Sequence, residues 1–137
     1  MGAGKRFSAS LGPDGTPGAM LGGAQAAVDT FVEEAGLDAR AAARLSVLIE
    51  EILANALRHG DATQAVIDLA RVGRAVTIEV EDDGAPFDPT VERSFTGPNP
   101  ETGGGVGLAL LRSWGGNLAY DRAEGRNHLS LTLRLER

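Results

Sequence analysis

The alternation of hydrophobic and polar residues along the chain predicts helices mainly in the first half. Residues 7–11 alternate between apolar and small polar side chains and lead into Gly and Pro, which predicts a short first strand and a turn. Residues 19–35 have helical periodicity. Residues 39–59 form a second predicted helix, which Asp38 is placed to cap and Gly60 to close.

The second half of the chain predicts a sheet. Residues 66–70 and 76–80 are strand-like runs with turn residues between them, so a hairpin is the simplest connection. Residues 84–105 are rich in Pro and Gly and are long for a passive loop, so we expect a lid. The closing elements are a helix and two strands, at 106–114, 117–121 and 128–135. Because helices and strands do not alternate, we expect an α+β fold, a two-layer sandwich with helices on one face of a mixed, largely antiparallel sheet.

The length and net charge of the chain limit the number of domains and the kinds of partner. A chain of 137 residues has room for one domain, which we place over 7–137, with 1–6 as a disordered N-terminal segment or a cloning remnant. A net charge of -6 argues against nucleic acid or an anionic membrane as a partner, because both require a basic surface. The absence of cysteine is compatible with a reducing compartment, and we expect a cytoplasmic protein.

The second predicted helix carries the first candidate site. Glu51 and Asn55 lie about 40° apart on the helical wheel, at one edge of its apolar face. That face is formed by Leu45, Leu48, Ile49, Ile52, Leu53 and Ala56. The pair therefore lines the rim of the core, although a plain surface pair at this spacing is the alternative interpretation.

Two further segments carry candidate chemistry. Asp82 ends a predicted strand and is followed by Gly84, so its carboxylate can accept a hydrogen bond from an amine such as N6 of adenine. An ordinary acidic turn is the alternative, and Asp82 is preferred over Asp83 only by its offset from Gly84. The glycines of 103–107 lead into a predicted helix, where free backbone N–H groups can bind phosphate, whereas a flexible linker is the alternative.

Taken together, these segments resemble the N, G1 and G2 boxes of the GHKL ATPases, which share the Bergerat ATP-binding fold. The order is Glu51-x-x-x-Asn55, Asp82-x-Gly84-x-Pro86 and Gly103-x-Gly105-x-Gly107-Leu108. Within this superfamily the chain is most similar to the anti-sigma-factor serine kinases, in the segments 49–60, 82–89, 105–112 and 120–129. The similarity covers nearly the whole chain from about Phe7.

The resemblance implies a role for each matching residue. Asn55 would hold Mg²⁺ on the phosphates, Asp82 would bind adenine, and Glu51 would be the general base. Arg58 and His59 would either contact phosphates or interact with the helix dipole. The nucleotide-binding residues implied by the motifs are Asn55, Arg58, His59, Asp82, Gly84, Pro86, Gly103, Gly104, Gly105, Val106, Gly107 and Leu108. The cofactors are ATP and Mg²⁺, and Phe87 and Trp114 are assigned no role.

The function implied by the resemblance is a protein-serine kinase acting on a small anti-anti-sigma partner, with a sigma factor as an optional second partner. Relatives often dimerise, which favours a homodimer. The main rival is a nucleotide-gated binding module with little turnover, against which the intact Glu51 counts. The catalytic domain of a histidine kinase is less favoured because no helix with an acceptor histidine precedes the domain in this sequence. A gyrase-like or chaperone-like ATPase would need further domains.

Overall fold

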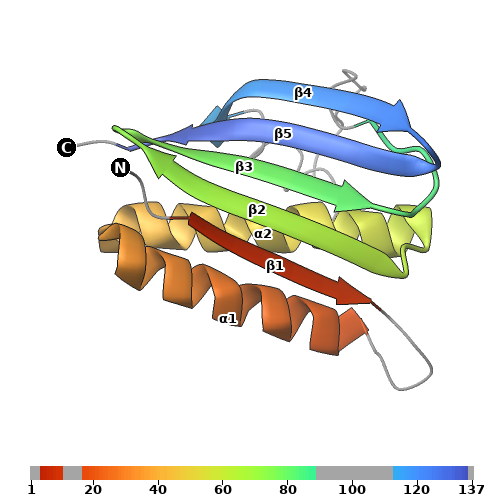
Figure 1. Cartoon of the computed structure of the whole chain (residues 1–137), viewed down its shortest axis with the longest axis horizontal. Helices are drawn as coiled ribbons and strands as arrows, with labels where there is room; N and C mark the ends of the chain where they lie inside the picture. The colour runs from red at the N-terminus through yellow and green to blue at the C-terminus, as the bar shows by residue number, and fades with distance from the viewer. Residues whose placement is uncertain (1–3, 11–16, 89–112, 136–137) are drawn as a thin grey trace.

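The computed structural model describes residues 4–10, 17–88 and 113–135, which form a sheet with two helices on one of its faces (Figure 1). In chain order the described elements are β1 (Gly4–Ser10), α1 (Pro17–Ala35), α2 (Ala39–Gly60), β2 (Gln64–Val72), β3 (Ala75–Asp82), β4 (Gly115–Ala123) and β5 (Arg126–Arg134). The predicted α+β class and the two-layer arrangement are confirmed.

The strands are ordered β1-β2-β3-β5-β4, and each described pair of neighbours is antiparallel. The sheet is therefore antiparallel in its described part rather than mixed. Because β3 lies between β2 and β5, its last residue, Asp82, has Ala65 on one side and Asn127 on the other. This register brings a residue from near the end of the chain to the strand end that carries the candidate carboxylate.

The end of α1 and the start of α2 lie where local sequence signals place them. The end of α2 differs, because Gly60 is still helical and Asp61, with a φ of 50°, is the C-cap. At the C-terminus of α1, Gly36 adopts a φ of 67°, and Leu37 N–H donates to the carbonyl of Val32 at 3.1 Å. This is the Schellman arrangement, in which a residue in the left-handed region, usually glycine, ends the helix. Asp38 then caps α2 by accepting from the backbone N–H of Ala41 at 2.8 Å, as the sequence predicted.

The core lies between the two helices and the inner face of the sheet. The predicted apolar face of α2 is buried in full, and it packs against alternate residues of β2, β3 and β5. The largest fully buried side chains are Phe31, Leu45, Leu48, Ile49, Leu53, Ile67, Ile78, Leu133, Val28, Val76 and Val80. Among the described residues, no helix has the length and apolar composition required to cross a bilayer.

Several boundaries differ from those predicted. β1 begins at Gly4, so residues 4–6 pair with β2 rather than belonging to a disordered N-terminal segment. Lys5 and Arg6 gave no hydrophobic signal, because an edge strand tolerates charged side chains. The strands β4 and β5 are also longer than predicted, and they meet in a tight turn at Glu124 and Gly125, both with positive φ. The predicted lid beyond residue 88 and helix residues 106–112 lie outside the described residues.

Candidate functional site

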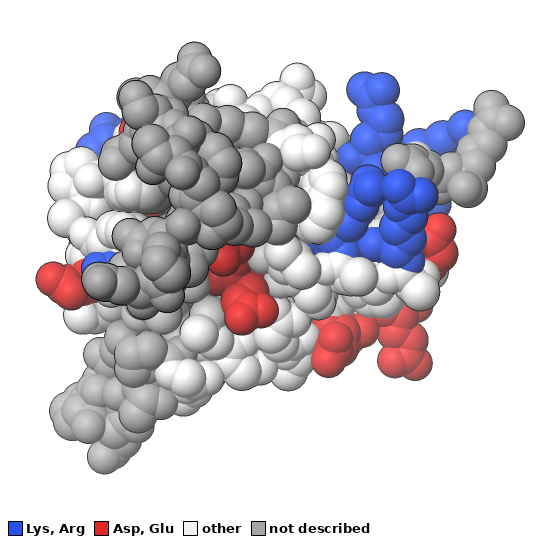
Figure 2. Space-filling model, turned by 180° about the vertical axis from the view of Figure 1, so that it is seen from behind, with Lys and Arg blue, Asp and Glu red and all other residues white. Residues whose placement is uncertain are grey.

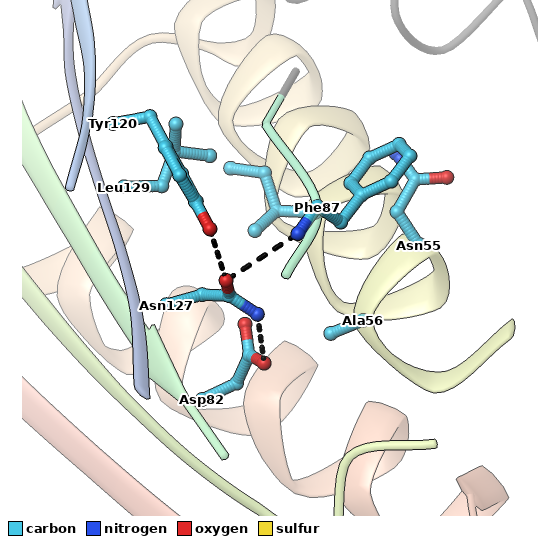
Figure 3. Close-up of a pocket in the computed structure, with 8 residues that line it drawn as sticks. Asn55, Ala56, Asp82, Phe87, Tyr120, Asn127 and Leu129 are labelled. Carbon is cyan, nitrogen blue, oxygen red and sulfur yellow. Dashed lines mark hydrogen bonds between the residues drawn. The ribbon is translucent and has the colours of Figure 1, made fainter. Parts of the chain in front are cut away.

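A pocket opens between the C-terminal half of α2 and the sheet, at the end of the sheet where β3 finishes (Figure 3). It is open to solvent, and the empty space in and in front of it, about 360 Å³, includes part of that solvent. The lining residues come from both layers of the fold: Ile52, Asn55, Ala56, Asp82, Phe87, Tyr120, Asn127 and Leu129. Such a pocket, with apolar walls and a few polar groups, can hold a flat ring system and orient it through its polar edge.

Asp82 provides the acidic group of this pocket. Its side chain is buried, with 7% exposure, and its Oδ1 accepts from the backbone N–H of Gly84 at 2.8 Å and from Asn127 Nδ2 at 3.0 Å. These two bonds fix the plane of the carboxylate. Oδ2 accepts no hydrogen bond from the described residues, so one acceptor atom remains for a ligand.

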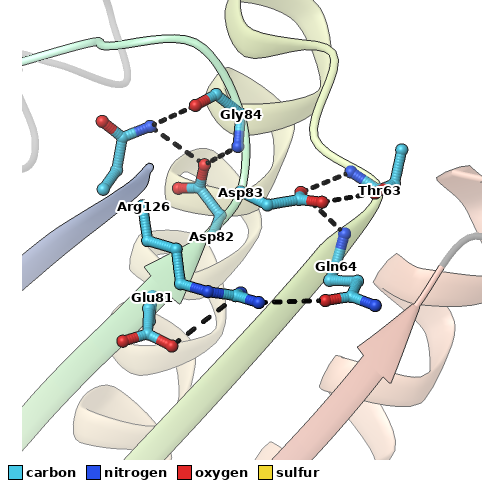
Figure 4. Close-up of polar contacts among 8 residues, drawn as sticks. Thr63, Gln64, Glu81, Asp82, Asp83, Gly84 and Arg126 are labelled. Carbon is cyan, nitrogen blue, oxygen red and sulfur yellow. Dashed lines mark hydrogen bonds and ion pairs between the residues drawn. The ribbon is translucent and has the colours of Figure 1, made fainter. Parts of the chain in front are cut away.

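The neighbouring Asp83 has a structural role instead (Figure 4). Its Oδ1 accepts from the backbone N–H groups of Thr63 at 2.7 Å and Gln64 at 2.9 Å, and its Oδ2 accepts from the Thr63 hydroxyl. Burial raises the pKa of this carboxyl, but the bonds from Thr63 and Gln64 outweigh that effect and hold it below its ordinary value of 3.8. Asp83 therefore joins β3 to the start of β2 and does not line the pocket.

A contact between two glycines holds the end of α2 against the turn after Asp82. A Cβ at Gly84 would lie 2.9 Å from both the carbonyl oxygen of Gly60 and Asp82 Oδ1. A Cβ at Gly60 would lie 3.1 Å from the backbone nitrogen of Ala85, which donates to the Gly60 carbonyl at 2.8 Å. Neither position has space for a side chain. The turn can therefore approach the helix end only because both residues are glycine.

Asn127 connects the strands around the pocket through both ends of its amide. Its Nδ2 donates to Asp82 Oδ1 and to the carbonyl of Ala85, at 3.0 and 2.8 Å. Its Oδ1 accepts from the Tyr120 hydroxyl and from Arg122 Nη1, the latter at 3.1 Å. The side chain is only 5% exposed. Asn127 thus links β3, β4 and β5 at the carboxylate that faces the pocket.

Glu51 and Asn55 both lie on α2 as predicted, but only Asn55 lines the pocket. Asn55 lines the pocket and is 5% exposed, whereas Glu51 lies one turn earlier and outside the lining residues. Arg58 joins the two, because its Nη2 is 3.4 Å from Asn55 Oδ1 and 3.9 Å from Glu51 Oε2. The Glu51 side chain is 24% exposed, so it is accessible to a group entering from solvent.

The segment after Gly84 contributes an aromatic wall. Phe87 lines the pocket, and its ring stacks on His59 with centroids 5.0 Å apart and planes 8° from parallel. His59 and Pro86 are exposed and do not line the pocket. Trp114 instead packs at the edge of the core, where the guanidinium of Arg44 lies 5.1 Å from its ring.

Comparison with known proteins identifies the family. Residues 16–133 match the family described as the histidine kinase-like ATPase domain. The chain belongs to this family. The serine/threonine-protein kinase BtrW of Bordetella bronchiseptica is 34% identical over 98 residues, which cover 64% of this chain and 67% of the relative. A blue-light activated histidine kinase of Erythrobacter litoralis shares the fold over 92% of this chain, with a TM-score of 0.52 and 22% identity. This chain spans 42% of that kinase's length.

Membership of the histidine kinase-like ATPase family implies ATP binding and an ATPase- or kinase-type function. Of the residues chosen from the sequence, the structure brings Asn55 and Asp82 into one pocket, with Gly84 directly behind the carboxylate. Glu51 and Arg58 lie beside it on the same helix. The phosphate-binding candidates Gly103, Gly104, Gly105, Val106, Gly107 and Leu108 lie outside the described residues.

Sequence reasoning missed three lining residues, Phe87, Tyr120 and Asn127. Phe87 receives no role from the sequence, because a single aromatic residue beside a core is usually a core residue. Tyr120 and Asn127 fall in the closing segments that resemble the family, but no role was assigned to them. A polar residue at an inward-facing position of an otherwise apolar strand is the signal that identifies Asn127, since it breaks the alternation continued by Leu129.

Proposed function

We propose that this chain is an ATP- and Mg²⁺-dependent protein-serine kinase of the anti-sigma-factor type, which phosphorylates a small anti-anti-sigma partner. The proposal rests mainly on one observation. Asn55 and Asp82, from a helix and a strand 27 positions apart in the chain, line the same pocket, and Glu51 lies one turn from Asn55. The identity of 34% to a serine/threonine-protein kinase supports serine as the acceptor.

Asp82 would select adenine. Its free Oδ2 can accept a hydrogen bond from the N6 amine of adenine, whereas guanine has a carbonyl oxygen at the equivalent ring position. A buried carboxylate facing that oxygen would be left without a partner, which costs about 1–3 kcal/mol or more for a charged group. The apolar walls formed by Ile52, Ala56 and Leu129 suit the faces of the ring.

Asn55 would supply the protein ligand for the metal. Within the described residues no group of three His, Cys, Asp or Glu side chains could hold a metal ion. This suits Mg²⁺, which commonly takes one or two protein oxygens and completes its coordination with phosphate oxygens and water. When bound, the ion would neutralise phosphate charge during transfer. Arg58 already contacts the Asn55 oxygen at 3.4 Å, so this cation would have to move toward the phosphates.

Glu51 would act as the general base. Its carboxylate would accept the proton of the substrate serine hydroxyl as the serine oxygen forms a bond to the γ-phosphorus. The bond from that phosphorus to the β–γ bridging oxygen breaks, and ADP leaves with the bond's electrons. Glu51 is suited to this step because it lies outside the adenine pocket yet remains partly exposed to an incoming protein.

The partner proteins follow from the proposal of this kinase type. We propose a small anti-anti-sigma-type protein as the substrate, a sigma factor as a second binding partner, a homodimer as the assembly and the cytoplasm as the location. The alternative of the same fold is a nucleotide-gated binding module with little kinase activity. The two functions differ in one measurable outcome, which is whether phosphate appears on a protein serine.

The decisive experiment incubates the purified chain with γ-labelled ATP, Mg²⁺ and the small proteins encoded by neighbouring genes. We expect a phosphoserine on one of them. Glu51→Ala should reduce its formation about 10²- to 10⁴-fold with nearly unchanged ATP affinity, whereas Asn55→Ala should reduce both. Glu50→Ala is the matched control, because Glu50 is the adjacent carboxylate of α2 but is exposed away from the pocket. If Glu50→Ala is inactive and Glu51→Ala is active, the assignment of the base is wrong.

A further inference from the structure

The end of the sheet farthest from the pocket exposes an apolar side chain between arginines. Val72 is 65% exposed and is the only large hydrophobic side chain classed as exposed among the described residues. It ends β2, pairs with Ala75 of β3, and Ala75 in turn pairs with Arg134 of β5. Cross-strand partners project from the same face of a sheet, so these side chains form one row on the face away from the helices. We call Val72, Ala75, Arg134 and the adjoining Arg74 the hairpin patch.

The two arginines of the hairpin patch carry charge that the described residues do not neutralise. Neither the Arg74 nor the Arg134 side chain forms an ion pair within that part of the chain. By contrast, Arg6, Arg58 and Arg126 each lie within 4.0 Å of a carboxylate oxygen. Basic side chains gather at one end of the molecule in Figure 2, although the chain as a whole has a net charge of -6. Arg74 and Arg134 therefore add a local positive charge to a chain whose net charge is negative.

Acidic side chains lie on both sides of the hairpin patch. Arg71, beside the patch, donates to the carbonyl of Ala35 at 2.6 Å, which places the end of α1 at the same end of the molecule. Glu33 and Glu34 are exposed in the last turn of that helix. Asp68, Glu79 and Glu81 are partly exposed farther along the outer face of the sheet. A negatively charged partner would therefore be directed to the hairpin itself.

The hairpin patch is separate from the nucleotide pocket. Ala75 begins β3 and Asp82 ends it, so seven residue steps of about 3.3 Å place the two ends roughly 23 Å apart. The patch also lies on the face of the sheet opposite α2. A partner bound there would leave the pocket accessible, and the chemistry proposed for Glu51 would not require the patch.

We propose that the hairpin patch binds an acidic segment of a partner protein, one that places an apolar side chain on Val72 and carboxylates on Arg74 and Arg134. Exposed apolar residues flanked by arginine are typical of the centre of a protein interface. Arginine also pairs with carboxylates in a bidentate geometry. A nucleic acid fits less well, because it requires many phosphate contacts over a long basic surface and offers nothing to bury Val72.

The test selects peptides from a phage-displayed library of random 12-residue sequences on the wild-type protein, with counter-selection on the double variant Arg74→Gln, Arg134→Gln. We expect enriched peptides with net negative charge and at least one apolar residue. By fluorescence anisotropy, the best of them should bind the double variant at least tenfold more weakly, because arginine is enriched among the few interface residues that carry most of the binding energy. Val72→Ser should also weaken binding.

The matched control is Arg126→Gln, which neutralises an arginine on the same strand and face at the opposite end of β5. It should bind the selected peptide like wild type, and circular dichroism should show that all variants are folded. The proposal is overturned if no peptide distinguishes wild type from the double variant, if the enriched peptides are neutral or basic, or if Arg126→Gln weakens binding equally. Tighter binding of a 20-nucleotide single strand, lost in the same double variant, would also overturn it in favour of a phosphate-binding surface.

Discussion

Replacing Asn127 by alanine should destabilise the protein more than its position near the end of the chain suggests. The side chain donates to Asp82 Oδ1 and the Ala85 carbonyl, and accepts from Tyr120 and Arg122. Alanine removes these bonds in a region that is largely buried. Asp82 Oδ1 keeps the bond from Gly84 N–H, and Arg122 keeps its bond to the Gly84 carbonyl. The change should also loosen the carboxylate that faces the pocket, so ATP affinity should fall together with stability.

The magnitude follows from the number and environment of the lost bonds. A hydrogen bond contributes about 1 kcal/mol net, and one to a charged group about 1.5–3 kcal/mol, so the sum for these four bonds is roughly 5–8 kcal/mol. The pocket is open, however, and water entering it can replace part of this loss. We therefore expect a decrease of about 2–4 kcal/mol in the free energy of unfolding, a large share of the roughly 5–15 kcal/mol typical of a domain.

Urea unfolding followed by the fluorescence of Trp114, the single tryptophan, measures this change. Tyr120→Phe removes one of the four bonds and should cost about 1 kcal/mol. Ser130→Ala is the control on the same strand, because Ser130 lies on the outer face and should change stability by less than about 0.5 kcal/mol. An Asn127→Ala variant that unfolds within 1 kcal/mol of wild type, or no earlier than Ser130→Ala, would refute the bridging role.

Three further predictions test neighbouring residues. Asp82→Asn should weaken ATP binding by at least tenfold in calorimetry, and wild type should bind GTP more weakly than ATP; equal affinities would remove Asp82 from the adenine site. Gly84→Ala should lower the midpoint of thermal unfolding and ATP affinity together, because its Cβ would lie 2.9 Å from the Gly60 carbonyl, whereas Gly22→Ala, on open helix surface, should not. Asp83→Asn should destabilise more at pH 7 than in acid, because the lowered pKa of Asp83 makes its carboxylate stabilising above about pH 4 and that contribution declines as pH falls through the folded value. Asp29→Asn, an exposed change, is the control for urea unfolding at both pH values.

Local signals in the sequence predicted most of the fold. The apolar face of α2 is buried as the helical wheel requires, and Asp38 caps the helix. These features depend on periodicity and on contacts within a few residues, so the sequence contains the information directly. The predicted start of β1 is too late because its first residues are charged, and pairing with β2 is a contact between residues 54 to 66 positions apart.

The pocket was only partly predictable for the same reason. Asn55 and Asp82 belong to short motifs, but which residues meet them depends on strand order. Because β5 lies between β3 and β4, Asn127 is the direct neighbour of Asp82, and Tyr120 reaches it from the next strand. The spacing of these residues along the sequence does not reveal the order of the strands in the sheet. The residues that complete the pocket can therefore be identified only once the strand order is known.

Asp82 and Asp83 are adjacent and chemically identical, but they have different roles because the backbone of a strand is pleated. Successive side chains of a strand point to opposite faces, so Asp82 continues the inward row of Val80, and Asp83 turns outward toward the start of β2. The inward carboxylate keeps one oxygen for a ligand, whereas the outward one accepts three bonds from Thr63 and Gln64. Those bonds hold the turn in place while Gly84 packs against the helix end that carries Asn55. Because Asp83 holds the turn, Asp82 can keep one carboxylate oxygen for a ligand.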